Sequence, residues 1–412
     1  MIKYHKTKLD NGLTVIVNED HTTQLAAVDV LYKVGARDEE KERTGFAHLF
    51  EHLMFGGSKH IPEFDTPLQL AGGTNNAFTS NDLTNYYDVV PVENIETALW
   101  LESDRMLQLD FSERSLNVQR NVVCEEFKEH YINRPYGDLW HKLRKIVYKK
   151  HPYQWPTIGL ELSHIQEAQL TDVENFFYKY YRPNNAILSI AGGISTDKAL
   201  ELAQKWFGDI PAGAEHQKNI AQEPEQTEAR FAEVKANVPV NLIYKVWKMP
   251  GRIDKKYYPI NLLGDVLGNG ESSRLFQRLK KEKKLFTDVA AYLSGSIDTG
   301  MFIISGKLSE NVTYEDAEKG IAEEIERIMS EKVNEKELER VKNTVTMDIA
   351  EGYTGVLNKA QGLAICEMLE DANIINTEID RFSSVTNDDV LTSAQNILIN
   401  NSCSTLYYAK NE

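Results

Sequence analysis

The sequence is short of cysteine, of positive charge and of long apolar runs. Cys124, Cys366 and Cys403 are its only cysteines in 412 residues, and this odd, widely spaced set excludes a disulfide framework and indicates a reducing compartment. No apolar run reaches the roughly 18 residues of a membrane-spanning helix. Lysine and arginine number 46 against 62 acidic residues, giving a formal net charge of -16. Such a surface repels phosphate groups, so we expect neither a nucleic-acid partner nor a membrane span.

Two further absences concern location and chemistry. The first ten residues, MIKYHKTKLD, lack the apolar segment of a signal peptide. We therefore expect a cytoplasmic protein, or a periplasmic one if a leader has been removed. Histidine is missing from residues 217–412, since all 10 histidines occur before residue 217. Any metal site built on histidine therefore belongs to the N-terminal half.

The length favours two domains, and 42% hydrophobic residues are enough for two cores. The segment 208–227, GDIPAGAEHQKNIAQEPEQT, contains two prolines and has no sustained apolar period, which is typical of a linker. We predict a first domain over 1–210, a linker over 211–227 and a second domain over 228–412.

The two halves share one order of elements, which indicates a duplication. SERSLNVQRNVVCEE from Ser112 aligns without a gap with NEKELERVKNTVTMD from Asn334. Each half reads strand, helix, strand pair, helix, helix. The expected strands are 28–34, 76–90, 241–247 and 289–306, and the expected helices are 46–57, 94–107, 259–270 and 314–329. The predicted fold class is α+β, with two similar domains that each pack helices on a mostly antiparallel sheet.

The pentapeptide HLFEH, from His48, carries the chemistry. On a helix, His48 and His52 lie one turn apart on one face, where their imidazoles can hold one zinc ion at about 2 Å. Glu51 can point into the same cleft without binding the ion, as a general base for water activated by the metal requires. This is the inverted form of the zinc-peptidase motif. The alternative is a buried helix with two core histidines and a solvated glutamate.

Catalytic zinc needs a third protein ligand, and Glu125, Glu126 and Glu129 are available in a helical register. The duplication allows the candidate ligands to be compared with the equivalent positions of the second half. The positions equivalent to His48, Glu51, His52 and Glu126 hold Asn261, Gly264, Asp265 and Asp348. A purely structural role would give the two helices no reason to differ in this way, so the contrast favours chemistry in the first half.

The residues resemble the pitrilysin, insulin-degrading enzyme and mitochondrial processing peptidase family of inverted-motif (HxxEH) zinc metallopeptidases, peptidase family M16, and most of all its short two-domain bacterial type. The similarity extends over essentially the whole chain. The segments that carry it are GFAHLFEHLMFGGSKHIP from Gly45, GGTNNAFTSNDLTNYYDVVP from Gly72, QRNVVCEEF from Gln119, HPYQWPTIG from His151, YYRPNNAILSIAGGI from Tyr180 and GESSRLFQRL from Gly270.

The resemblance implies one Zn²⁺ per chain, with Glu51 as the catalytic base and His48, His52 and Glu126 as metal ligands. It also implies that Asn76 and Ala77 contact the substrate backbone near the cleaved bond. Gln119 stands where relatives usually carry a glutamate close behind the metal site. Glutamine accepts the same hydrogen bond but brings no charge, so we expect altered activity and retained zinc.

The second half departs from the family at Lys280 and Thr287. Family members that cleave alone carry there an arginine and a tyrosine that face the substrate carbonyl. Lysine lacks the guanidinium fork and threonine is too short to replace a phenol. Arg278 or Tyr292 could substitute only if the register slips. We favour a heterodimer whose homologous partner supplies both groups, with a homodimer as the alternative.

The sequence therefore predicts a zinc metalloendopeptidase subunit that hydrolyses peptides or unfolded protein segments. The competing hypothesis is a non-catalytic structural or peptide-binding subunit of a larger complex.

Overall fold

The computed structural model describes residues 1–214, 218–295 and 297–411. Its contacts divide the chain into two compact units, each assembled from three segments. Unit 1 comprises Met1–His130, Trp155–Ala221 and Ala350–Asn376, and unit 2 comprises Tyr131–Gln154, Gln222–Ile349 and Thr377–Glu412. The predicted linker, 211–227, contains one of the passages between the units, and its residues 215–217 lie outside the described residues.

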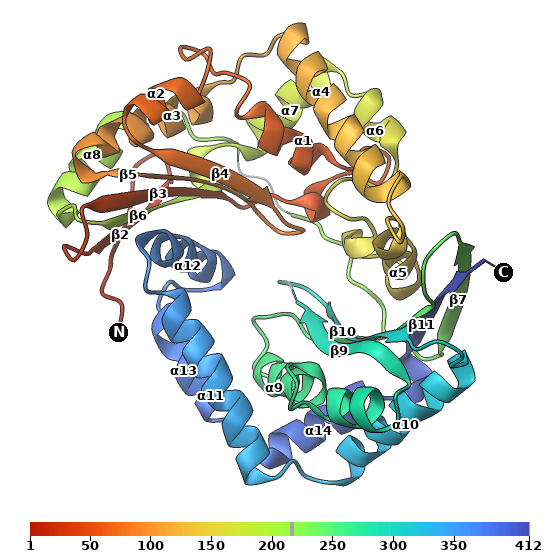
Figure 1. Cartoon of the computed structure of the whole chain (residues 1–412). Coiled ribbons are helices and arrows are strands. Elements are labelled where there is room, and N and C mark those ends of the chain that lie inside the picture. Colours follow the sequence, from red (N-terminus) through yellow and green to blue (C-terminus); the bar gives the residue numbers. More distant parts are fainter. Residues whose placement is uncertain (215–217, 296, 412) are drawn as a thin grey trace. The chain divides into compact units, whose positions relative to one another are not determined.

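Unit 1 is built on a six-stranded sheet in the order β1-β2-β6-β3-β5-β4 (Figure 1). Neighbouring strands are antiparallel, except that β2 runs parallel to β6. The strands are β1 (His5–Lys8), β2 (Thr14–Glu19), β3 (Leu25–Tyr32), β4 (Thr74–Thr79), β5 (Thr84–Pro91) and β6 (Ala186–Gly192).

Unit 2 is built on a five-stranded sheet in the order β7-β11-β8-β10-β9. Its one parallel pair, β7 with β11, corresponds to β2 with β6, and the antiparallel pairs follow in the same sequence. The strands are β7 (Arg230–Ala236), β8 (Leu242–Met249), β9 (Phe286–Ser294), β10 (Gly300–Leu308) and β11 (Ser404–Lys410). The predicted duplication and the α+β fold class are confirmed.

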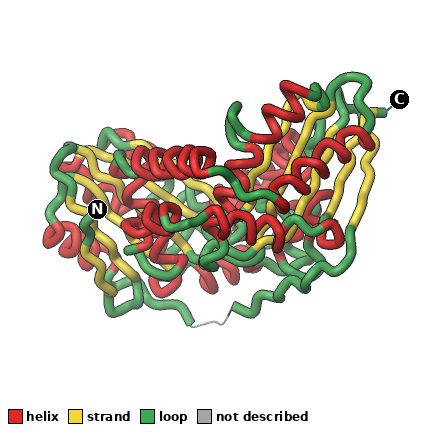
Figure 2. The backbone as a smooth tube through the Cα atoms, turned by 90° about the horizontal axis from the view of Figure 1, so that it is seen from below, coloured by secondary structure: helices red, strands yellow, loops and turns green. Residues whose placement is uncertain are grey.

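Helices pack against both sheets, as Figure 2 shows in red against yellow strands. The α-helices are α1 (Phe46–Leu53), α2 (Asp65–Leu70), α3 (Ile95–Leu107), α4 (Glu113–Phe127), α5 (Leu139–Val147), α6 (Leu162–Gln166), α7 (Leu170–Tyr180), α8 (Thr196–Phe207), α9 (Tyr257–Gly268), α10 (Tyr314–Ser330), α11 (Glu335–Gly352), α12 (Val356–Leu369), α13 (Ile374–Ser383) and α14 (Asn387–Ile397). The 3-10 helices are η1 (Ala36–Asp38), η2 (Val92–Asn94), η4 (Pro152–Gln154), η5 (Pro183–Asn185) and η7 (Asn400–Ser402), and the π helices are η3 (Lys128–Ile132) and η6 (Phe276–Glu282). Within the described ranges, every helix is too short or too polar to serve as a membrane span.

Each unit contains one helix that comes from the other half of the sequence. Helix α12, from the C-terminal part of the chain, lies against β2, β3 and β6 of unit 1 (Figure 1). Ala360 of α12 packs on Ala27 and Ala191, all three fully buried. Small side chains at all three positions let the helix approach the sheet closely. Unit 1 therefore needs residues that follow strands β7 to β10 of the second sheet in sequence and precede its last strand, β11.

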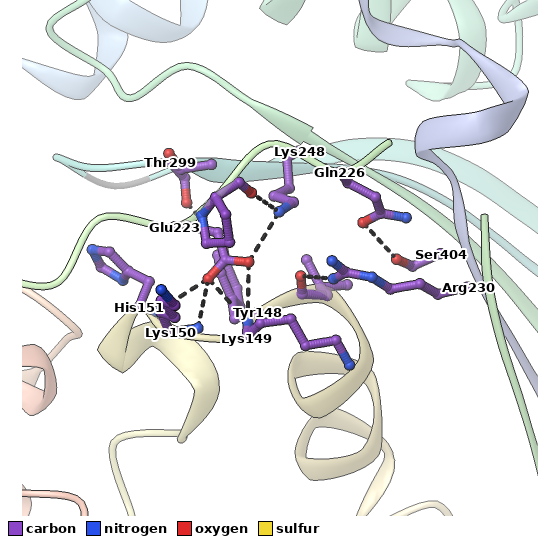
Figure 3. A network of polar contacts seen from close by, with 12 residues as sticks. Tyr148, Lys149, Lys150, His151, Glu223, Gln226, Arg230, Lys248, Thr299 and Ser404 are labelled. Atoms are coloured by element: carbon purple, nitrogen blue, oxygen red, sulfur yellow. Dashed lines mark hydrogen bonds and ion pairs between the residues drawn. The ribbon is translucent and has the colours of Figure 1, made fainter. Parts of the chain in front are cut away.

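Conversely, helix α5 comes from the N-terminal part of the chain but belongs to unit 2. Its Leu139, Leu143 and Val147 pack into the core of that unit. Its C-terminal end is fixed by Arg230, whose Nη1 donates to the carbonyls of Ile146 and Val147 at 2.9 and 2.7 Å. The following turn is held by the carboxylate of Glu223, as Figure 3 shows. This carboxylate accepts hydrogen bonds from the backbone N–H groups of Lys149, Lys150 and His151, and it forms an ion pair with Lys248.

Candidate metal centre

Helix α1 is amphipathic, because its apolar residues recur at helical spacing and form one buried face. Phe46, Leu49, Phe50 and Leu53 are all buried, which leaves the histidines and the glutamate on the other side. The helix starts after Gly45, whose φ of +91° is a left-handed conformation. A side chain there would also meet the Ile158 carbonyl oxygen at 2.6 Å, so only glycine permits this entry into the helix.

Helix α4 supplies the third donor. It begins at a serine cap, where Ser112 Oγ accepts the N–H of Ser115 at 3.2 Å. Leu116, Val123 and Phe127 are buried and so fix the rotation of the helix about its axis. Glu126, in the last turn, consequently faces α1.

The structure brings His48, His52 and Glu126 together. Glu126 Oε2 lies 3.7 Å from His48 Nε2 and 3.4 Å from His52 Nε2. One donor atom from each of the three half-buried residues lies within 4.8 Å of the others. Of the three glutamates that the sequence left open, Glu126 is the one that meets both imidazoles.

This arrangement fits a zinc ion. Donors about 2.0–2.2 Å from a tetrahedral ion lie about 3.3–3.6 Å from one another, close to the two separations from Glu126. Two imidazole nitrogens and a carboxylate are a donor set that zinc accepts, and three protein ligands leave a fourth position open, as catalytic zinc sites do.

The protonation states suit a cation. Burial lowers the pKa of His48 to about 4, an effect that the charge of Glu126 opposes and that of His52 assists. The hydrogen bond from His52 lowers the pKa of Glu126. Neutral imidazole and ionised carboxylate are the forms that bind a metal, and the site favours both at neutral pH.

Glu51 lies beside this cluster, and its carboxylate is held by a residue that sequence reasoning missed. Thr79 Oγ1 donates to Glu51 Oε2 at 2.6 Å. Burial raises the pKa of Glu51, and the hydrogen bond from Thr79 acts in the opposite direction. A carboxylate with a raised pKa is suited to take up and release a proton near neutral pH. The only sequence signal for Thr79 is its place in the segment GGTNNAFT.

Comparison with known proteins gives the family. Residues 14–159 match "Insulinase (Peptidase family M16)" and residues 167–345 match "Peptidase M16 inactive domain". Zinc protease PqqE of Helicobacter pylori is 32% identical over 353 residues, which cover 82% of this chain and 78% of that protein. The chain belongs to peptidase family M16.

Two further comparisons concern the fold and a relative that is named as a subunit. The crystal structure of a protease from Helicobacter pylori superimposes with a TM-score of 0.93 at 28% identity, covering 99% of this chain and 100% of that one. The mitochondrial-processing peptidase subunit beta of Saccharomyces cerevisiae is 29% identical over 208 residues, which cover 50% of this chain and 44% of that protein.

The second M16 half has two carboxylates at the positions of His52 and Glu126 but no histidine. Asp265 on α9 and Asp348 on α11 occupy the positions of His52 and Glu126. The pKa of Asp265 is raised by burial and, further, by the charge of Asp348. The two carboxylates therefore interact, as their counterparts do in unit 1, which supports the gap-free alignment of the helices.

Strand β4, the last strand of the first sheet, carries Asn76 and Ala77. Asn76 is exposed and Ala77 is half-buried. The Ala77 N–H donates to Asn76 Oδ1 at 2.8 Å. An edge strand offers its unpaired backbone groups to another strand, and in this structure one of them is occupied by the side chain of Asn76.

Gln119 lies on α4, seven residues before Glu126 and so about 10 Å along the helix. It lines a pocket of about 530 Å³ together with Gly56, Ser58 and Ser115. The structure thus puts Gln119 on the same helix as Glu126 but two turns away from it.

Lys280 and Thr287 lie on η6 and β9 of unit 2. Lys280 Nζ stands 4.8 Å from the ring centroid of Phe276, and Thr287 is exposed on the edge strand. Arg278, one possible replacement, is paired with the fully buried carboxylate of Glu324 at 3.3 Å. The other, Tyr292, is engaged as well: burial raises its pKa, and its hydroxyl hydrogen-bonds to Ser305 and Tyr244.

Proposed function

We propose that this M16 chain is a zinc-dependent endopeptidase subunit that cleaves peptides or unfolded protein segments. The observation that carries the proposal is the meeting of three donor atoms from α1 and α4, with separations of 3.4 and 3.7 Å from Glu126 Oε2. A carboxylate held by Thr79 lies beside them. The name of PqqE, "Zinc protease", supports the choice of metal.

His48, His52 and Glu126 would hold the zinc ion. A zinc ion at such a site acts as a Lewis acid towards the scissile carbonyl and lowers the pKa of water. The protein side chains do the remaining work. Burial keeps His48 neutral, and the carboxylate of Glu126 offsets part of the charge of the cation.

Glu51 would move the proton. Its Oε2 is fixed by Thr79, and we assign to Oε1 the proton taken from the attacking water. The same carboxyl then passes this proton to the leaving amine, so that the residue ends each cycle ionised. Its raised pKa makes both transfers accessible near neutral pH.

The substrate would bind as an added strand along β4. An extended peptide gains backbone hydrogen bonds from an open sheet edge whatever its sequence. On binding, a substrate carbonyl would replace Asn76 Oδ1 as the acceptor of the hydrogen bond from the Ala77 N–H. The released Asn76 amide would then contact the peptide backbone. Folded proteins rarely offer such a strand, which favours peptides and unfolded segments as substrates.

The subunit would work with a homologous partner. Lys280 and Thr287 replace the arginine and tyrosine expected there, while Arg278 and Tyr292 are engaged inside unit 2. We therefore propose that a second chain of the same fold supplies the missing pair, with a homodimer as the alternative. The name of the yeast relative, a processing peptidase subunit, supports an assembly of subunits. For the location we propose the cytoplasm, with the periplasm as the alternative.

Zinc analysis and cleavage of an unstructured peptide library test the proposal. Wild-type protein should hold one zinc per chain and cleave. Glu51→Gln should keep the zinc and lose cleavage by about 10²- to 10⁴-fold. Glu126→Gln should lose the zinc, whereas Glu125→Gln, a matched change on an exposed side chain of α4, should retain it.

Each alternative has its own result. In one such result, the wild-type protein holds zinc and binds peptides but cleaves them no faster than Glu51→Gln, at the background rate. That result would favour a peptide-binding subunit. Mass spectrometry of the native complex should find a second chain of similar size; this chain alone with full activity would refute the heterodimer.

A further inference from the structure

A buried carboxyl group stands at the N-terminus of α1. Glu39 follows η1 and is 8% exposed. Its Oε2 accepts the N–H of Gly45 at 2.9 Å and its Oε1 accepts the N–H of Ala47 at 2.8 Å. Both bonds are buried, so the carboxyl satisfies two backbone donors that water does not reach.

Helix α1 needs such a partner. The first N–H groups of a helix have no partner within it, and the residue at the cap position, Gly45, has no side chain to provide one. With eight residues, α1 has little intrinsic stability of its own. Its position therefore depends on contacts from outside, of which Glu39 supplies two.

The segment after α1 is fixed by a second carboxylate. Asp104, on α3, accepts the hydroxyl of Ser58 at 2.5 Å and the backbone N–H of His60 at 3.0 Å. The short helix is thus held from both sides. At its N-terminal side the bond to Ala47 falls on the residue immediately before His48.

We propose that Glu39 is a positioning residue of the metal centre, which holds the first turn of α1 so that His48 and His52 meet Glu126. The inference rests on the proposed zinc site. A shift of this turn would move His48 away from Glu126 Oε2, from which it already stands 3.7 Å away.

The second half is consistent with this role. Counting 213 residues on, which is the offset from His48 to Asn261, the position of Glu39 holds Arg252. This arginine is paired with Glu378 at 3.0 Å. The half without the metal ligands therefore also lacks an acid at this point.

Zinc affinity and the cobalt spectrum of the full chain test the proposal. Glu39→Gln keeps the size of the side chain and loses one acceptor oxygen, and Glu40→Gln makes the same change on the adjacent, exposed residue. Affinity is measured by competition with a chromophoric chelator at pH 8.5, because burial raises the pKa of Glu39 to about 8. The Co²⁺ absorption bands report ligand geometry directly, without reference to activity.

We expect Glu39→Gln to bind zinc about 10- to 100-fold more weakly and to shift the Co²⁺ bands, with Glu40→Gln as wild type. Glu39→Asp, whose shorter carboxylate reaches one of the two N–H groups, should lie between. Wild-type affinity and bands in Glu39→Gln, or failure of both Glu39 variants to fold, would overturn the positioning role. Absence of zinc binding in wild type would instead refute the proposed function.

Discussion

Thr79 Oγ1 lies 2.6 Å from Glu51 Oε2 and donates a hydrogen bond to it. Thr79 is the last residue of β4, and Glu51 lies in the last turn of α1. The strand proposed to receive the substrate therefore also holds the proposed base. In the proposed mechanism, the positions of the substrate and of the base are therefore coupled through one hydroxyl group.

Replacing Thr79 with valine should lower kcat about 10-fold with little change in KM or zinc content. Valine has nearly the same shape but cannot donate, so Glu51 loses its orientation while the metal ligands keep theirs. Steady-state kinetics on an unstructured peptide and zinc analysis measure the two effects separately.

Thr79→Ser is the matched control for this change. It retains the hydroxyl group and should restore most of kcat. Equal loss in the serine and valine variants would mean that packing of the Thr79 methyl group, and not its hydrogen bond, is what matters.

The sequence predicted the parts of this molecule that follow local rules. Apolar spacing placed α1, and the strands and helices expected in each half are present because periods of two and of 3.6 residues identify them. The choice of Glu126 over its neighbours came from family resemblance, since Glu125 and Glu129 fit the helical register equally well.

What could not be predicted depends on contacts between distant segments. The packing of Ala360 on Ala27 joins residues more than three hundred positions apart, and no local pattern encodes such a pairing. Thr79 and Glu39 escaped notice for the same reason. A threonine on a strand or a glutamate before a helix is ordinary, and only the fold shows that each bonds to α1.

Restoring the missing pair should raise the activity of the chain without a partner. In the double variant Lys280→Arg and Thr287→Tyr, a guanidinium fork and a phenol replace an ammonium and a short hydroxyl. Removal of one such donor typically costs about 10²–10³ in kcat, so we expect a gain of at least about 10-fold. Peptide cleavage by purified chain alone is the measurement.

Lys281→Arg provides the control, since Lys281 is the next residue on η6 and also lies over Phe276, at 5.2 Å. It should leave activity unchanged. No gain in the double variant, with normal folding and zinc content, would contradict a requirement for the arginine and tyrosine at these positions.

Overpacking α12 should destabilise unit 1, although the substitution is in the C-terminal part of the sequence. Ala360 is fully buried against Ala27 and Ala191, so Ala360→Leu forces the helix off the sheet at a cost of about 1–3 kcal/mol. Asn358→Leu, on the exposed side of α12, should cost much less. Urea unfolding tests both, and equal stability of the two variants would argue against the close packing of α12.

The ion pair between Lys359 of α12 and Asp20 should make this packing sensitive to acid. The hydrogen bond from Lys359, assisted by Thr22, lowers the pKa of Asp20 from 3.8 to about 2. Because the folded-state pKa lies below the unfolded one, the stabilisation is present above about pH 4 and is lost as the pH falls towards 2. We expect Lys359→Met to lose about 1 kcal/mol at pH 6, after allowance for solvent screening, and to show a shallower decline in stability between pH 5 and pH 3.

Lys198→Met, which removes an exposed pair with Glu201, should follow the wild-type curve. Parallel pH profiles for wild type and Lys359→Met in urea unfolding would show that Asp20 is not held by this lysine.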